Sequence, residues 1–495
     1  MGYELRTRQL KMYNTFSKKE EVLELGDVVK IYVCGITAYD YSHIGHARSS
    51  VIFDTLRRYL EFLGKKVVYV QNFTDVDDKI IRRAVAEGRT QKEIAEEYIQ
   101  KYFEDMERLN VRKADFHPKV TENIPEIIEA VKKIIEKGYA YEVGGDEVEK
   151  ESKDVYFHVP SFPEYGKLSG MSLEELNRHR IEPDPRKKDP KDFALWKAAK
   201  EEDYKAKSYF DSPWGDGRPG WHIECSVLAT KYLGAPFDIH GGGKDLIFPH
   251  HENERAQSYA LFDVEPVRYW IHNDFVTING EKMSKSLGNI IKIRDVLSRF
   301  EGEVLRYFLL SAHYRSPLDY SEEAIKRAER SYNSIKNAIE NLDMEIAALK
   351  TFSIDKENDE EKKEEKEKKT EVLKEMERFE EEFRKAMNDD LNTPRALAVL
   401  HELASFINQV VSSGAFSIHT LEELFQRSIA LCKVLGFFEK YERIPELHKY
   451  KDLIKEREEA RKAKNFQRAD EIREILRKEG IILIDTPRGT RWKMG

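Results

Sequence analysis

The stretch that decides the fold runs from Val28 to His46 and reads VVKIYVCGITAYDYSHIGH. Its first six residues are mostly apolar or β-branched, which is typical of a buried strand that ends at Cys34. After His46 the apolar residues recur at helical spacing as far as Gly64, and a second apolar run follows at 67–70. We therefore predict an α/β fold with a doubly wound, Rossmann-like parallel sheet. Its ligands should lie at the carboxyl ends of the strands.

Two short motifs contain side chains suited to phosphate chemistry. His43-Ile44-Gly45-His46 combines two imidazoles with a glycine that lets a phosphate approach the backbone. Far along the chain, Lys282-Met283-Ser284-Lys285-Ser286 places two lysines in a loop, where they can neutralise growing negative charge. Taken by itself, the second motif is equally well interpreted as a polar turn.

Composition indicates a soluble protein of several domains. The chain has 495 residues, more than a single hydrophobic core usually supports, and 35% of them are charged. No apolar run approaches the roughly 18 residues of a membrane span, so we expect no membrane association. The first residues lack the basic-then-apolar pattern of a signal peptide, and three cysteines cannot form a closed disulfide framework. These features favour a cytoplasmic location.

Changes in composition divide the chain into regions. Residues from about 120 to 205 end in a proline-rich, basic stretch, which we interpret as an insertion that splits the nucleotide-binding domain. From about residue 321 the pattern becomes mostly helical. The predicted regions are the first half of the nucleotide-binding domain (1–120), the insertion (121–205), the second half of that domain (206–275), a region that contains the lysine loop (276–320), a helical bundle (321–440) and a small C-terminal α/β region (441–495).

Charge is distributed unevenly. The net charge of −8 argues against indiscriminate binding to nucleic acid. From Lys449 to Lys493, however, 14 lysines and arginines face 9 acidic residues, so the C-terminal region is basic. The stretch 355–371 has 15 charged residues out of 17, and we interpret it as a solvated helix or exposed linker.

Four residues far apart in the sequence suggest a metal site. Cys34 ends the first strand, Cys225 lies in a predicted helix, and His250 and Glu254 are spaced to share one face of another. Zinc accepts thiolate, imidazole and carboxylate ligands. A buried cysteine can also be a small hydrophobe, and adjacent histidines can merely cap a helix. The spacing alone leaves both interpretations open.

Three consecutive glycines follow another predicted strand. The strand is Phe237-Asp238-Ile239-His240, and Gly241, Gly242 and Gly243 come next. Backbone without side chains lets a flat ligand such as adenine approach closely. A simple flexible turn is the alternative.

The ordered motifs resemble those of class I aminoacyl-tRNA synthetases, and within them the cysteinyl-tRNA synthetases. The resemblance covers nearly the whole chain, although 355–371 matches no family motif. It rests on these segments: Cys34 to His46, Gln71 to Lys79, Gly217 to Cys225, Phe237 to Gly243, Phe248 to Gln257 and Glu281 to Asn289.

The resemblance implies ATP-dependent activation of L-cysteine to cysteinyl-adenylate, followed by transfer to the 3′ end of tRNA(Cys). It implies a zinc ion that selects the substrate thiolate over serine, magnesium with ATP, and a chain that acts as a monomer. The implied zinc ligands are Cys34, Cys225, His250 and Glu254. The implied amino-acid site contains Gly35, Thr37, Thr74 and Trp221. The implied ATP site contains His43, Gly45, His46, Gly241, Gly242, Gly243, Lys282, Met283, Ser284, Lys285 and Ser286, of which His43, His46, Lys282 and Lys285 are the expected catalytic residues.

The basic C-terminal region offers candidates for reading an anticodon. Arg461, Phe466 and Asp470 combine a guanidinium, a stacking ring and a hydrogen-bond acceptor, which suit unstacked RNA bases. An amphipathic helix with Phe466 in its core is the alternative.

Three other functions share parts of this pattern. A paralogous ligase would activate cysteine and pass it to an amino-sugar, but such relatives lack an RNA-binding C-terminus. A degenerate RNA-binding protein would not need intact His43, His46, Lys282 and Lys285. A simple nucleotidyltransferase would not need the candidate metal ligands.

Overall fold

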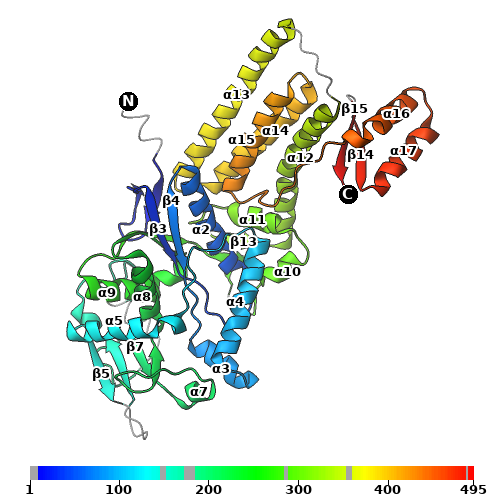
Figure 1. Cartoon of the computed structure of the whole chain (residues 1–495). Helices are drawn as coiled ribbons and strands as arrows, with labels where there is room; N and C mark the ends of the chain where they lie inside the picture. The colour runs from blue at the N-terminus through cyan, green and yellow to red at the C-terminus, as the bar shows by residue number, and fades with distance from the viewer. Residues whose placement is uncertain are drawn as a thin grey trace, which may run out of the picture. The chain divides into compact units, whose positions relative to one another are not determined.

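The computed structural model describes residues 9–144, 152–171, 175, 184–283, 288–352, 359–486 and 489–495, without the side chains of 282 and 359–368. The chain forms two compact units (Figure 1). The first contains Met1–Ile325 and Asn388–Asn392, and the second contains Lys326–Met387 and Thr393–Gly495. In the described residues no helix is both long enough and apolar enough to cross a membrane.

A four-stranded parallel sheet forms the centre of the first unit, in the order β10-β9-β3-β4. Its strands are β3 (Val28–Val33), β4 (Lys66–Gln71), β9 (Phe237–Gly243) and β10 (Val267–Asn273). Ile31 lies opposite both Tyr69 and Ile239. The chain leaves β3 for β4 on one side and later adds β9 on the other. Ligands bind at such a reversal of strand order, so the carboxyl ends of β3 and β9 are where a site is expected.

Helices cover this sheet. The helix α2 (Ile44–Phe62) packs against β4, β9 and β10, and α8 (Trp221–Leu233) packs against β3 and β4. The predicted helix after the first strand is thus confirmed, and His43 at its N-cap accepts a hydrogen bond from the backbone of His46. The remaining helices that surround this core are α3 (Asp78–Glu87), α4 (Gln91–Arg108), α5 (Ile124–Glu136) and α9 (Glu252–Phe262).

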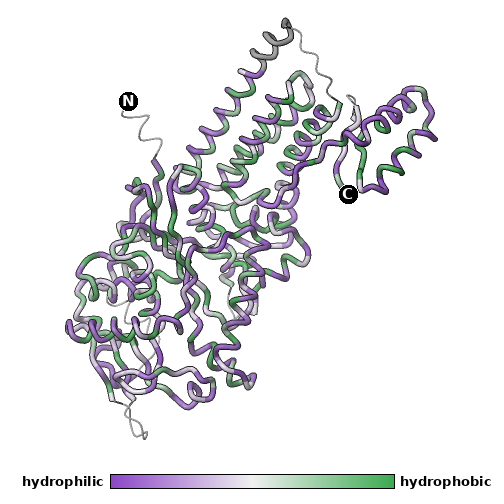
Figure 2. The backbone as a smooth tube through the Cα atoms, in the orientation of Figure 1, coloured by the Kyte–Doolittle hydropathy of each residue, from purple (hydrophilic) through white to green (hydrophobic). Residues whose placement is uncertain are grey.

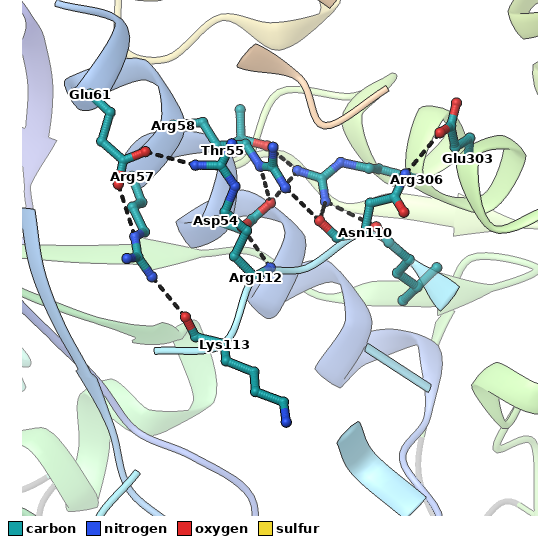
Figure 3. Close-up of polar contacts among 11 residues, drawn as sticks. Asp54, Thr55, Arg57, Arg58, Glu61, Asn110, Arg112, Lys113, Glu303 and Arg306 are labelled. Atoms are coloured by element: carbon teal, nitrogen blue, oxygen red, sulfur yellow. Dashed lines mark hydrogen bonds and ion pairs between the residues drawn. The ribbon is translucent and has the colours of Figure 1, made fainter. Parts of the chain in front are cut away.

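Buried charges fix α2 to the elements around it (Figure 3). The carboxylate of Asp54 accepts hydrogen bonds from Arg58 at 2.7 Å, from Arg306 at 2.5 Å and from the backbone of Arg112 at 3.0 Å. Burial opposes ionisation of Asp54, but the two guanidinium groups outweigh it and lower the pKa of this carboxyl. The cluster therefore stabilises α2 as part of the catalytic core.

A second sheet interrupts the parallel one between α5 and α8. Its four strands are antiparallel, in the order β5-β6-β7-β8. They are β5 (Ala140–Gly144), β6 (Lys153–Phe157), β7 (Phe193–Ala198) and β8 (Gly217–Pro219), with the short helix α7 (Glu201–Lys205) between the last two.

Shorter elements complete the first unit. The strands are β1 (Lys11–Asn14), β2 (Lys19–Val22), β11 (Val276–Ile278), β12 (Glu281–Lys282) and β13 (Leu318–Tyr320), and the helices are α10 (Ile293–Leu297) and α11 (Gly302–Leu310). A late segment returns to this unit, where buried Asp390 accepts hydrogen bonds from the Tyr13 backbone at 2.9 Å and the Tyr314 hydroxyl at 2.5 Å.

The second unit begins with long helices. They are α12 (Glu322–Phe352), which starts in the first unit, α13 (Asp359–Asn388), α14 (Thr393–Ser413) and α15 (Ile418–Val434). Hydrophobic and hydrophilic stretches alternate along α14 and α15, as expected for helices with one buried face (Figure 2). The charged stretch is helical from residue 359 onward, which agrees with one of its two predicted forms, and its first four residues lie outside the described ones.

The C-terminal part of the second unit is a small α/β structure. Two helices, α16 (Lys451–Lys462) and α17 (Phe466–Lys478), precede a hairpin of β14 (Ile481–Thr486) and β15 (Gly489–Met494). Trp492, Ile472 and Leu476 belong to its core. The small C-terminal α/β region predicted from the sequence is confirmed.

Candidate active site and metal centre

Two loops meet at the carboxyl ends of β3 and β4. The backbone N–H of Gly35 donates to the side chain of Asn72 at 2.9 Å, and Thr37 pairs with Thr74 through the backbone. A Cβ on Gly35 would lie 1.6 Å from the carbonyl oxygen of Asn72, so only glycine permits this approach. The contact brings together three of the four residues expected around an amino acid.

The four predicted metal ligands converge beside these loops. Cys34 follows β3, Cys225 lies in α8, His250 lies just before α9 and Glu254 lies in the first turn of α9. One potential ligand atom from each lies within 4.8 Å of the others, and three of the four side chains are buried. The two sulfurs are 3.7 Å apart and both cysteines are free. The structure therefore confirms that these distant residues form one cluster that is compatible with a metal ion.

The charge state of the cluster also suits a cation. Burial opposes ionisation of Cys225, but the hydrogen bond from the Cys34 thiol lowers the pKa of Cys225 to about 6. Burial likewise lowers the pKa of His250, yet the nearby Glu254 carboxylate, 3.0 Å away, raises it to about 10. Cys225 and Glu254 are thus available as thiolate and carboxylate ligands, whereas Cys34, whose pKa burial raises, and His250 would each release a proton to a metal ion.

A second, overlapping set of ligands shares two of these residues. Cys34 and Glu254 also approach His251 and His240, with 3.3 Å from the Cys34 sulfur to His251 Nε2 and 2.8 Å from His240 Nε2 to Glu254. The sequence prediction preferred His250 over the adjacent His251, and it did not include His240. His240 ends the apolar part of β9, at the predicted ligand-binding edge of the sheet, and this position was the signal that could have identified it.

Further histidines surround the cluster. His251 contacts His272 with 2.7 Å between ring nitrogens, and His222 contacts His250 at 2.8 Å. Burial lowers the pKa of His222 and His251 well below the usual value, and that of His272 to about 3. These three rings are therefore neutral and can each donate and accept one hydrogen bond.

A cavity of about 350 Å³ opens next to the cluster. Thr37, Trp221, His222 and Glu224 line it, together with residues of the inserted sheet that include Phe193. Trp221 is 38% exposed and its ring lies over that of His250, with 4.2 Å between centroids. This arrangement leaves room for a small ligand between the predicted amino-acid site and the metal ligands.

The two motifs predicted to bind phosphate also meet. The rings of His43 and His46 stack with 3.7 Å between centroids at the N-terminus of α2. A Cβ on Gly45 would lie 3.3 Å from the Met283 methyl group, and Met283 Sδ accepts a hydrogen bond from the Ile291 backbone at 3.5 Å.

Part of the second motif lies outside the described residues, namely Ser284, Lys285 and Ser286, together with the side chain of Lys282. The Lys282 backbone belongs to β12.

The three glycines at the end of β9 have close protein neighbours. A Cβ would lie 2.3 Å from the Phe53 ring at Gly241, 2.8 Å from the His251 ring at Gly242 and 2.5 Å from a carboxylate oxygen at Gly243. Packing of these side chains is therefore one reason why glycine stands here. The adenosine contact expected of these glycines remains a prediction.

The anticodon candidates lie in the C-terminal α/β structure. Phe466 begins α17 and is 61% exposed, so it is outside the core. Asp470 is exposed one turn further along the same helix, and Arg461 in α16 pairs with Asp485. The exposed ring argues against the alternative in which Phe466 is a core residue.

Comparison with known families agrees with this architecture. The model of the tRNA synthetases class I (C) catalytic domain matches residues 21–330, and that of the DALR domain matches residues 382–439. A solved methionyl-tRNA synthetase from Mycobacterium tuberculosis, in complex with methionyl-adenylate, superposes with a TM-score of 0.60 at 16% identity, over 82% of this chain and 91% of that one. Fold and paired motifs together define a class I aminoacyl-tRNA synthetase.

Similar sequences narrow the class. A cysteine--tRNA ligase of Archaeoglobus fulgidus is 63% identical over 98% of this chain and 100% of its own length. Those of Carboxydothermus hydrogenoformans and Thermococcus onnurineus are 48% and 47% identical over 98% of this chain, covering 100% and 99% of their own lengths. The chain belongs to the cysteine--tRNA ligase family, and as a tRNA synthetase it binds tRNA, ATP and an amino acid.

Proposed function

We propose that the chain activates L-cysteine with ATP to cysteinyl-adenylate and transfers it to the 3′ end of tRNA(Cys). The observation that carries this proposal is the buried cluster of Cys34, Cys225, His250 and Glu254 beside a cavity lined by Thr37 and Trp221. A bound zinc ion would accept the substrate thiolate and discriminate against the neutral hydroxyl of serine. Discrimination at binding makes a separate editing site unnecessary.

The chain's own residues would position the reacting groups. Gly35, Thr37, Thr74 and Trp221 would hold the amino acid so that its carboxylate attacks the α-phosphate of ATP in line. His43 and His46 would contact the phosphates, with Lys282 and Lys285 closing over the β- and γ-phosphates, which magnesium accompanies. Positioning and charge stabilisation are sufficient for this reaction, so no covalent enzyme intermediate is needed.

The remaining ATP contacts would come from Gly45, from Met283, Ser284 and Ser286 of the second motif, and from Gly241, Gly242 and Gly243 beside the adenosine. The contact between Met283 and the first turn of α2 supports this assignment, because it joins the two motifs in space.

In the second step the terminal ribose hydroxyl of tRNA would attack the adenylate. The DALR domain match supports tRNA binding by the second unit. Arg461, Phe466 and Asp470 would contact the anticodon, and the exposed Phe466 ring supports stacking on an unpaired base. We further propose that the chain acts as a cytoplasmic monomer, which light scattering would test by giving the mass of one chain.

Two assays test the reaction. Cysteine-dependent exchange of pyrophosphate into ATP should occur with L-cysteine and not with L-serine, and tRNA(Cys) should then be charged with labelled cysteine. Exchange without charging would instead favour a ligase that uses an amino-sugar acceptor. Absence of both activities would contradict the proposal and favour a non-catalytic RNA-binding protein.

Metal analysis tests the ligand set. Cys225→Ser should lose most of the bound zinc, because Cys225 belongs to the proposed set and not to the overlapping one. Cys432→Ser is the matched control, since Cys432 is also buried and outside any disulfide but lies in the second unit. Full zinc in Cys225→Ser together with zinc loss in His251→Asn would show that the overlapping set binds the metal.

A further inference from the structure

Glu224 is a buried carboxylate in the wall of the cavity. It lies in the first turn of α8, directly before Cys225, and its side chain is only 1% exposed. The Thr74 hydroxyl donates a hydrogen bond to one of its oxygens at 3.0 Å. Glu224 therefore connects two elements of the proposed site: the helix α8 that lines the cavity and the loop that contains Thr74.

Among the described residues no lysine or arginine forms an ion pair with Glu224, and the neutral hydroxyl of Thr74 is its hydrogen-bond partner. Burial raises the pKa of this carboxyl, and a cation beside it would favour the ionised form. Two cations of the same cavity wall pair with other carboxylates: Lys197 pairs with Asp78 at 3.2 Å, and Arg218 pairs with Asp203 at 2.8 Å. Buried carboxylates are almost always paired, so this position is suited to a cation from a ligand.

We propose that Glu224 binds the α-ammonium group of the amino-acid substrate. The inference rests on the proposed function and adds a residue to its site. Cysteine has three polar groups, and the metal cluster would bind its thiol. With the ammonium bound at Glu224, the carboxylate of the substrate cysteine remains free to face the ATP phosphates. The hydrogen bond from Thr74 fixes the orientation of the Glu224 carboxylate before substrate arrives, which reduces the entropy lost on binding.

The test compares two ligands that differ only in the ammonium group. L-cysteine and 3-mercaptopropionate have the same thiol and carboxylate. Their binding to the zinc-loaded protein is measured by calorimetry for the unmodified chain and for Glu224→Gln. We expect the affinity for cysteine to fall at least about 30-fold in the variant, because a buried charge pair loses one partner. The affinity for 3-mercaptopropionate should change by no more than about twofold, since that ligand does not meet Glu224.

The matched control is Asp77→Asn. Asp77 lines the same cavity and is also acidic, but it caps α3, a role that asparagine fills equally well. This variant should bind cysteine nearly as well as the unmodified chain. An equal loss in Asp77→Asn and Glu224→Gln would show that general negative potential attracts the ammonium, and would overturn the assignment to Glu224.

Other outcomes are also informative. If Glu224→Gln weakens both ligands equally, Glu224 has only a structural role and the inference is wrong. Binding of 3-mercaptopropionate by the variant itself shows that the site is folded, and Glu224→Asp should recover part of the preference for cysteine. Failure of the unmodified chain to catalyse cysteine-dependent exchange would contradict the proposed function. Normal exchange with unchanged selectivity in Glu224→Gln would contradict this inference alone.

Discussion

His117 lies near the carboxyl end of β4, and both of its ring nitrogens are hydrogen-bonded. Nε2 accepts from the Ala114 backbone at 3.0 Å, so Nδ1 carries the proton that is shared with the Gln71 carbonyl at 2.9 Å. The ring also stacks on Phe73. Burial lowers the pKa of His117 to about 4, and protonation would abolish the bond from Ala114.

We predict that His117 makes stability depend on pH. The unfolded chain binds this proton near pH 6.5, whereas the folded chain binds it only near pH 4, so stability is lost as the pH falls through this window. Between pH 7 and pH 5 the contribution should fall by about 2 kcal/mol. Urea unfolding gives the free energy of unfolding of the unmodified chain and of His117→Gln at both pH values. The difference between the two proteins should be smaller at pH 5 than at pH 7 by this amount. An equal difference at both pH values would contradict the prediction.

At the residue scale, the sequence indicated some site residues and not others. Cys34, Cys225, His250 and Glu254 have side chains typical of zinc ligands, and the family resemblance grouped them before any contact was known. Glu224 and His240 gave no comparable signal, because an isolated acidic residue or histidine in a sequence is most often exposed or structural. Their importance follows from burial and from neighbours that only the fold brings together.

At the scale of elements, the buried ion cluster of α2 gives a second prediction. Arg306→Met should lower the free energy of unfolding by about 3 kcal/mol, because Asp54 would stay buried with one guanidinium instead of two. Thermal and urea unfolding measure the change. Lys101→Met, which removes an exposed pair with Glu104, is the control and should have no measurable effect. If both variants lost a similar free energy of unfolding, burial of the cluster would not account for its stabilising effect.

Secondary structure near the site was predicted well where local patterns decide it. The strand 28–33 has the predicted bounds, since a short apolar run between turn residues is a local signal. The region around His250 shows the limit of such reasoning. A helix was expected directly after Pro249, and the chain is helical there, but its first turn, Ile247–His251, is π-helical and the regular α-helix α9 begins only at Glu252. Packing of two adjacent histidines into the buried cluster decides this geometry, and no local pattern encodes that packing.

At the scale of the whole molecule, the C-terminal structure should act in charging and not in activation. Phe466→Ala is predicted to leave cysteine-dependent pyrophosphate exchange unchanged and to lower kcat/KM for tRNA(Cys) about tenfold or more, because base stacking on an aromatic ring is lost. Ile475→Ala is the control, since Ile475 is also exposed on α17 but nine residues away, on the opposite side of the helix. Equal effects of the two variants would argue against a specific contact.

Long-range organisation could be predicted only in outline. The insertion, the helical part and the C-terminal strand followed from changes in composition and periodicity. No sequence pattern predicts that a short segment, Asn388–Asn392, returns to the first unit, because the hydrogen bonds of Asp390 connect it to residues far away in the chain.

That return has a consequence for how the protein is made. The bond from Tyr13 to Asp390 spans 377 residues, and the metal cluster joins Cys34 to a residue 220 positions later. On a translating ribosome the first strand is therefore complete long before its partners leave the exit tunnel. The strands β3 and β4 can pair early. The cluster can form only after residue 254 has been synthesised, and the contacts of Asp390 with the first unit only after residue 390. An enzyme that supplies the ribosome with charged tRNA thus completes its own catalytic unit only late in its synthesis.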